Sequence, residues 1–415
     1  MFDELEVKDE NKGVAESVVY ELPKPGERRL KATTYLLNDR DWAPIRIKVS
    51  AEDLKNESMY CKAAGEKRPN FLGELVECEE TDVITEAKKN DLLKTILPEA
   101  IKLHADRLLV KPVPGPVVVS VPSKGVCPHF TVPEEHMTRG VNLTDFVLYV
   151  AAGPGATFTS ICSEESIEDR PFSAVMNFEP ARILPTRYAV RIAAHEIAHA
   201  LGFSFRRMRE LEMTDYFDFP GEKIKYQVNS KMTRNVSQRH YNCEESRGAF
   251  LEEEGGTWNM VSHWERRDAK DELMSVYFDL PGAMLYTAFT MAAFEDMKYF
   301  RANWGKEETM SWGKDAGCEF QYINCVEDKK STYPSMFCNS TSETLKCTSD
   351  RFALGECSLT TYNNDLPLKY RYFLRARKEA GSAETLTDRC PIIAPTAATV
   401  CTNGKEESMP GSRVG

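Results

Sequence analysis

Residues 195–202 read His-Glu-Ile-Ala-His-Ala-Leu-Gly, and this octet decides the fold that we expect around it. On a helix, His195 and His199 are one turn apart and point the same way, so their imidazoles can bind one metal ion. Glu196 can then reach a water molecule on that metal. The pattern is typical of a zinc-dependent peptidase.

The segment around the octet has the ends of a helix. Pro185 and Thr186 favour a helix start, and Gly202 is the helix stop expected of a C-cap glycine. Between them, apolar residues at helical spacing form one face, which the two histidines flank: Ala189, Ile192, Ala193, Ile197 and Ala200. The octet therefore lies on an amphipathic helix.

The sequence before this helix is mostly β. Period-two alternation or continuous apolar runs predict strands, and apolar pairs at helical spacing predict one further helix that Pro98 kinks. The expected strands cover 45–49, 117–121, 146–152 and 172–178, and the expected helix covers 86–109. We therefore predict an α+β fold.

Composition limits the partners. At 415 residues and 42% hydrophobic residues, the chain can form two or three domains with a sizeable core. A net charge of −11 argues against nucleic acid or an anionic membrane surface as a partner. No apolar run is long enough to span a membrane, the N-terminal residues lack the apolar core of a signal peptide, and the C-terminal residues lack an anchor-addition tail.

Twelve cysteines without a C-x-x-C pair indicate disulfides and an oxidising compartment. Four N-glycosylation sequons agree with that compartment: Asn56, Asn142, Asn235 and Asn339. We therefore expect an extracellular or cell-surface protein. Because the sequence shows no signal peptide, we expect it to be incomplete at its N-terminus.

The octet leaves the third metal ligand open. A catalytic zinc needs three protein ligands and an open position for water. The compact metzincin pattern requires a histidine where this chain has Phe205. His240 and His263 lie further along. His240 lies in a charged stretch, 206–256, that we interpret as an insertion, and we expect the His240 side chain to be solvated. A downstream glutamate would instead give a gluzincin-type site.

The sequence resembles the leishmanolysin family, the metzincin surface proteases of trypanosomatid parasites. The resemblance covers roughly residues 40–405 and rests on HEIAHALGF, HWERRDAKDELM, YTAFTMAAFEDM, WGKDAGCEF and the cysteine spacing that follows. It implies that His195, His199 and His263 bind one Zn²⁺ per chain, across a long insertion. It also implies that Glu196 is the general base and that Met274 is the Met-turn residue packed beneath the metal.

The resemblance also implies five disulfides between cysteines near one another in sequence. The implied pairs are Cys61 with Cys78, Cys127 with Cys162, Cys243 with Cys318, Cys325 with Cys390, and Cys338 with Cys357. Cys347 and Cys401 lack their expected partners.

Four segments follow from the resemblance and the composition. We expect a disordered N-terminal segment over 1–27, and a metzincin-type catalytic domain with a twisted sheet and the active-site helix over 28–203. An inserted central domain over 204–317 carries the third histidine, the Met-turn and a helix over 281–300, and we interpret its Arg266/Arg267 pair as a solvated face. The remainder, 318–415, is a Cys-rich, loop-rich domain that we expect to be truncated.

The function expected from these residues is a zinc-dependent endopeptidase that hydrolyses peptide bonds of proteins with a metal-activated water and Glu196 as base. The resemblance also suggests a role in surface adhesion and host interaction, with membrane attachment only through a lipid anchor that this sequence does not show. The alternative is a catalytically inactive surface or adhesion relative that keeps the fold. The sequence does not indicate an oligomeric state.

Overall fold

The computed structural model describes residues 17–21, 31–35 and 42–400, apart from gaps at 164–169, 218–223, 255–259, 278–281, 328–329, 341–344 and 374–375. Within the expected disordered segment 1–27, only β1 (Ser17–Glu21) is described, and it pairs antiparallel with β2 (Lys31–Tyr35). The rest of that segment lies outside the described residues.

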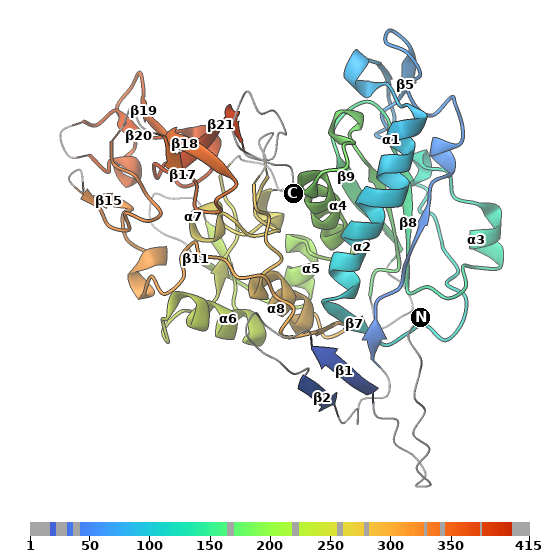
Figure 1. The fold of residues 1–415 in the computed structure, drawn as a ribbon, viewed down its shortest axis with the longest axis horizontal. Coiled ribbons are helices and arrows are strands. Elements are labelled where there is room, and N and C mark those ends of the chain that lie inside the picture. Colours follow the sequence, from blue (N-terminus) through green and yellow to red (C-terminus); the bar gives the residue numbers. More distant parts are fainter. Residues whose placement is uncertain are drawn as a thin grey trace.

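A four-stranded sheet forms the centre of the N-terminal half (Figure 1). Its strand order is β4 (Ile47–Ser50), β8 (Phe146–Ala151), β10 (Ser173–Asn177) and β9 (Phe158–Ser163). The first three strands are parallel, whereas the edge strand β9 runs antiparallel to β10. The strands expected over 45–49, 146–152 and 172–178 are confirmed, and β9 was not predicted.

Strand β8 is buried along its whole length because both faces of the sheet are covered. Phe146, Leu148 and Val150 pack into the cluster that contains the helices, while Val147 and Tyr149 pack into a second cluster on the opposite face. Burial on both faces explains why this strand reads as a continuous apolar run and not as an alternation.

The helices on one face are α1 (Glu86–Asp91), α2 (Leu97–Ala105) and α4 (Arg187–Ala200), and a π-helical turn, Leu92–Ile96, joins α1 to α2. Pro98 lies in the first turn of α2, where its missing N–H is tolerated. The expected helix over 86–109 is therefore confirmed as far as Ala105, and strand β7 (Leu108–Val110) replaces its last residues.

The strand expected over 117–121 is wrong. Val117 and Val119 are buried in the second cluster, but only Val117 forms a bridge, with Val141. Pro116 and Pro122 flank the segment and cannot donate to a ladder. The alternating burial of residues 117–121 therefore comes from a loop that packs against the second cluster and not from a strand.

The charged stretch 206–256 is folded and partly buried. His240 within it is half-buried and bonded to the Trp312 carbonyl, so the expectation of a solvated His240 is wrong. The stretch contains α5 (Phe205–Glu210), α6 (Lys231–Tyr241) and a small sheet, β11 (Thr214–Phe217), β12 (Lys225–Val228) and β13 (Ala249–Phe250). Apolar side chains of this stretch join the same core cluster as helix α4, so one core connects the two halves: Met208, Val228, Val236 and Tyr241.

Two further expectations for the central region are corrected. The helix expected over 281–300 is limited to α8 (Ala288–Asp296), whose N-cap is Thr287. Arg266 and Arg267, on α7 (Arg266–Ala269), do not form a solvated face, because Arg267 is buried and the Arg266 Nε donates to the Thr385 carbonyl. Charged residues with internal partners can occupy the interior, which composition does not show.

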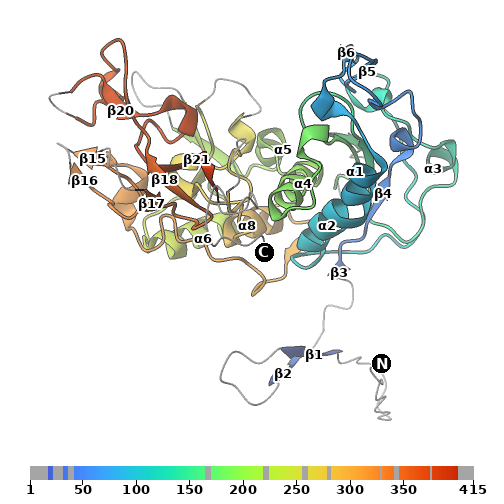
Figure 2. The same ribbon diagram turned by 45° about the horizontal axis from the view of Figure 1, so that its top comes forward.

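The C-terminal half consists of short strands and turns around disulfides (Figure 2). Its strands are β14 (Arg301–Ala302), β15 (Val326–Glu327), β16 (Lys330–Ser331), β17 (Lys346–Cys347), β18 (Ala353–Cys357), β19 (Leu359–Thr361), β20 (Glu379–Gly381) and β21 (Ile393–Val400). The N-terminal half also contains β3 (Ala43–Pro44), β5 (Lys67–Pro69), β6 (Leu75–Glu77) and α3 (Glu134–Thr138). No described helix is both long enough and apolar enough to span a bilayer.

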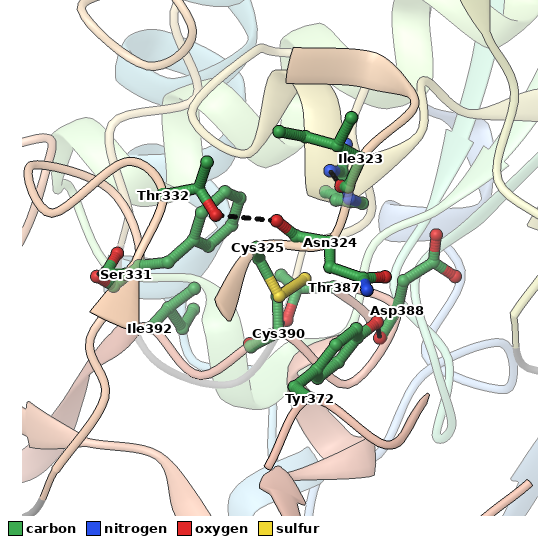
Figure 3. The surroundings of a disulfide bond; sticks show 12 residues. Ile323, Asn324, Cys325, Ser331, Thr332, Tyr372, Thr387, Asp388, Cys390 and Ile392 are labelled. Carbon is green, nitrogen blue, oxygen red and sulfur yellow. Dashed lines mark hydrogen bonds between the residues drawn. A yellow bond between two sulfur atoms is a disulfide. The ribbon is translucent and has the colours of Figure 1, made fainter. Parts of the chain in front are cut away.

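Among the described residues there are five disulfides, and they are the five pairs that the resemblance implies: Cys61–Cys78, Cys127–Cys162, Cys243–Cys318, Cys325–Cys390 and Cys338–Cys357. Figure 3 shows Cys325–Cys390, which ties the start of the Cys-rich region to a loop near its end. Cys347 is exposed and forms no disulfide among the described residues, and Cys401 lies outside them.

Gly202 ends helix α4 as expected. Its φ is +109°, its N–H donates to the His199 carbonyl, and the Phe203 N–H donates to the Ala198 carbonyl. These two bonds form a Schellman motif. The turn sets the direction of the chain directly after the second histidine of the octet.

We expect Gly202→Ala to lower the free energy of unfolding by about 2 kcal/mol or more, because a side chain is strained at this φ. A Cβ at Gly202 would also lie 2.8 Å from the Tyr299 hydroxyl oxygen. Gly65 has φ +80° and nothing within 4 Å of its Cβ position, so Gly65→Ala should cost only about 1 kcal/mol. Equal losses in denaturant unfolding would contradict a role for close packing at Gly202.

Candidate metal centre

Three histidine side chains meet at the C-terminal end of α4. The Nε2 atoms of His195 and His199 are 3.0 Å apart, and the Nε2 atom of His263 lies 3.1 Å from the first and 3.2 Å from the second. His195 and His199 share a helix face, whereas His263 comes from the loop before α7, 64 residues after His199. The fold therefore closes a triangle of three ring nitrogens.

Each of the three imidazoles is oriented by a backbone carbonyl. The Nδ1 of His195 lies 2.7 Å from the Leu273 oxygen, that of His199 2.6 Å from the Phe203 oxygen, and that of His263 3.2 Å from the Met260 oxygen. A carbonyl can only accept, so each Nδ1 carries the proton and each Nε2 presents a lone pair. Such bonds orient metal-binding histidines and raise their basicity as ligands.

Burial keeps the rings of His195 and His199 neutral. It lowers the pKa of His199 to about 4 and holds the pKa of His195 well below its usual range, helped by the neighbouring imidazoles. Three neutral lone pairs that face one another cannot hydrogen-bond to each other. A cation among the three nitrogens would remove this repulsion.

The donor set fits a four-coordinate metal ion. Tetrahedral bonds of about 2.0–2.1 Å from zinc to nitrogen place the nitrogens about 3.3–3.4 Å apart. The observed separations of 3.0–3.2 Å are close to that value. Three protein nitrogens leave one position for water or substrate, as in catalytic zinc sites.

Glu196 lies beside the triangle and is held by Tyr277, a residue that we did not predict. The Tyr277 hydroxyl donates to Glu196 Oε1 at 3.1 Å, and its ring packs edge-on against His195. Burial raises the pKa of Glu196 to about 7, while the hydroxyls of Thr159 and Tyr277 oppose that shift. No sequence signal marks Tyr277, because an aromatic residue after a Met-turn is by default a core residue.

Met274 lies in a turn that touches two of the histidine segments. It is fully buried, its carbonyl accepts from the Trp264 N–H, and the preceding carbonyl, of Leu273, accepts from His195. Glu272 holds this turn, because its side chain accepts from the Met274 N–H and from the hydroxyls of Thr287 and Thr290 on or beside α8. The turn therefore orients the ring of His195 and holds the segment that carries His263.

The histidines line a cleft of about 680 Å³. Residues of the edge strand β9 also line this cleft. The remaining lining residues include Glu196, Phe205, Arg206, Val276 and Tyr277.

The two other candidates for the third ligand, His240 and a downstream glutamate, do not take part in the triangle of histidines. The His240 Nε2 donates to the Trp312 carbonyl at 2.8 Å, and the His240 ring packs edge-on against Phe289. Among the described residues, no carboxylate joins the group of three histidines. The geometry favours His263 over His240 and over a glutamate.

The expected glycosylation sites differ in exposure. Asn56 and Asn142 are exposed, whereas Asn235, on α6, and Asn339 are half-buried. Asn56 and Asn142 therefore remain the better predictions for glycan attachment.

A helix that carries H-E-x-x-H, closed by a distant histidine and a buried methionine turn, defines a metallopeptidase-type centre. A profile of the leishmanolysin peptidase family matches residues 28–414. The leishmanolysin homologue of Crithidia fasciculata is 35% identical over 378 residues, which cover 89% of this chain and 57% of that protein. This chain belongs to the leishmanolysin family.

Two further relatives agree. Leishmanolysin of Leishmania major is 32% identical over 93% of this chain and 64% of its own length. Leishmanolysin of Leishmania donovani is 34% identical over 91% of this chain and 65% of its own length. The chain thus spans 57–65% of the length of these three relatives.

We expect His263→Ala to reduce zinc bound by the purified protein from about one ion per chain to a small fraction, because two histidines leave the site open. The measurement is metal content after dialysis against buffered zinc. His240→Ala is the matched control and should keep its zinc. Full zinc retention in His263→Ala would rule out His263 as a ligand.

Proposed function

We propose that this protein is a zinc-dependent endopeptidase. The observation that carries the proposal is the set of three Nε2 lone pairs that converge in a cleft beside the buried carboxyl of Glu196. Membership of a metallopeptidase family supports the same reaction class. His195, His199 and His263 would hold the ion, and Zn²⁺ is the metal that suits three imidazoles and an open position.

The bound zinc would polarise the scissile carbonyl and lower the pKa of water at its open position to about 7. Glu196 would take a proton from that water and pass it to the leaving amine. Tyr277 keeps the Glu196 carboxyl in position through its hydroxyl. The buried surroundings of Glu196 raise its pKa to about 7, close to the range in which a group both takes and gives a proton.

The substrate class follows from the wall of the cleft. Strand β9 is an edge strand, and in the described sheet only its β10 side is paired. An extended peptide can pair with the other side of β9 and place one of its peptide bonds over the metal ligands. Recognition through the backbone favours many protein and peptide substrates over one small molecule.

We further propose that 28–203 is a metzincin-type catalytic domain, that 204–317 supplies the third ligand and the Met-turn, and that 318–415 is a Cys-rich domain. Five disulfides support an oxidising, extracellular or cell-surface location. Surface adhesion and a lipid anchor remain proposals from the family resemblance. A catalytically inactive relative would bind zinc in the same triangle and cleave nothing.

The decisive test is Glu196→Gln. This change keeps the volume of the side chain but removes its ability to take a proton, so zinc content should stay near one ion per chain. Cleavage of casein should fall by about 10²–10⁴-fold. Chelator-sensitive cleavage by the unchanged protein is the positive control. Full activity of Glu196→Gln would contradict the proposed role of Glu196 as the general base.

Tyr277→Phe tests the positioning of Glu196. We expect kcat/KM to fall by about tenfold, less than the full contribution of a general base, because the carboxylate loses one donor. That donor favours the charged form and lowers the Glu196 pKa, so its loss should move the acidic limb of the pH–rate profile to higher pH. Tyr216→Phe, at an exposed site on β11, is the control. An unmoved acidic limb would contradict this role for Tyr277.

A further inference from the structure

A second group of metal-ligating side chains lies apart from the three histidines. Glu252, Glu253 and Glu265 each offer a carboxylate oxygen, and these three oxygens lie within 4.8 Å of one another. Glu252 is 0% exposed and Glu265 is 1% exposed. Carboxylates are rarely gathered in an interior, because each one loses its hydration there.

The hydrogen bonds around this acidic cluster leave oxygens without donors. Glu252 accepts from the backbone N–H groups of Glu254 and Arg266, and Glu265 Oε1 accepts from the Arg267 N–H. Glu265 Oε2 is buried and has no hydrogen-bond partner among the described residues. A buried carboxylate oxygen that faces two other carboxylates and lacks a donor indicates a missing cationic ligand.

The nearby charges do not balance the cluster. Lys225 Nζ contacts Glu253 at 3.0 Å and Asp388 at 2.9 Å, so one lysine serves two carboxylates. Arg267 pairs with Asp268. Arg389 lies over the rings of Tyr362 and Tyr370. Glu252 and Glu265 therefore form no ion pair with a cationic side chain among the described residues, and a divalent cation would supply that partner.

A cavity gives an ion a route to the cluster. It has a volume of about 320 Å³, and Glu265, Lys225 and Asp388 are among the residues that line it. Figure 3 shows Asp388 and Tyr372 beside the Cys325–Cys390 disulfide, which holds this wall of the cavity in place. The buried Oδ1 of Asp388 also has no hydrogen-bond partner among the described residues.

We propose that Glu252, Glu253 and Glu265 form a binding site for a hard, oxygen-preferring divalent cation of the calcium class. Ca²⁺ takes six to eight oxygen ligands at about 2.3–2.6 Å in flexible geometry, so three carboxylates completed by water suit it better than they suit zinc. This site is separate from the histidine triangle and is not needed for the chemistry proposed there.

The position of the site gives the cation a structural consequence. The Glu252 N–H donates to the His263 carbonyl at 3.0 Å, and the Glu265 N–H donates to the Phe250 carbonyl at 2.9 Å. A cation bound by both side chains would therefore cross-link the segment 250–252 to the segment 263–265, which contains His263. It would stabilise the loop that delivers the third histidine to the metal centre.

The test is calorimetric titration of the purified full chain with CaCl₂ through about 10⁻⁴–10⁻³ M, the range of extracellular calcium sites. We expect saturable binding of about one Ca²⁺ per chain, and a loss of affinity of about tenfold or more in Glu265→Gln. Glu134→Gln, on the exposed face of α3, is the matched control and should bind as the unchanged protein does. No saturable binding, or equal binding by Glu265→Gln, would overturn the proposal.

Thermal melting separates loss of the site from loss of the fold. Ca²⁺ should raise the melting temperature of the unchanged protein and of Glu134→Gln in a concentration-dependent way, but not that of Glu265→Gln. Without Ca²⁺, Glu265→Gln should melt no lower than the unchanged protein, because it loses a buried charge. If Glu265→Gln does not fold, Glu252→Gln gives the same comparison. If Ca²⁺ does not change the melting temperature of the unchanged protein, protons alone neutralise the acidic cluster and the proposed cation site is wrong. Neither readout depends on peptidase activity.

Discussion

The proposed metal centre depends on three hydrogen bonds from histidine Nδ1 atoms to backbone carbonyls. The carbonyls of Phe203, Leu273 and Met260 belong to three separate segments, and each fixes one ring so that its Nε2 faces the other two. Neutral lone pairs held this close repel one another without a cation. The surrounding structure must therefore hold those carbonyls in place, and this requirement links the helix end, the Met-turn and the loop before α7.

The support for these carbonyls comes from buried polar groups as well as apolar packing. Gly202 turns the chain so that the Phe203 carbonyl returns to His199. Glu272 binds the Met274 N–H and two threonine hydroxyls, which holds the Leu273 carbonyl over His195. The proposed cation site would do the same for His263, through the backbone bond between Glu252 and that histidine. Each of the three histidines is thus oriented by its own local interactions, and the elements that provide them pack on one hydrophobic core.

Sequence reasoning succeeded where the cause is local or where a family pattern carries the information. The period of helix α4, its stop at Gly202 and the strands around β8 follow from patterns within a few residues. It failed at 117–121, where only Val117 forms a bridge, and at 206–256, where apolar side chains between the charged residues join the core. Tyr277 was missed because its function arises from a contact with Glu196, 81 residues away.

The sequence by itself determined the helix, two of the three histidines and the carboxyl between them, because 3.6 residues per turn place His195 and His199 on one face. The family resemblance named His263 and the five cysteine pairs. Only the tertiary structure closed the triangle to 3.0–3.2 Å, placed Tyr277 on Glu196 and gathered three glutamates around one point. Those arrangements join residues far apart in the chain, and their geometry depends on how one core packs both halves together.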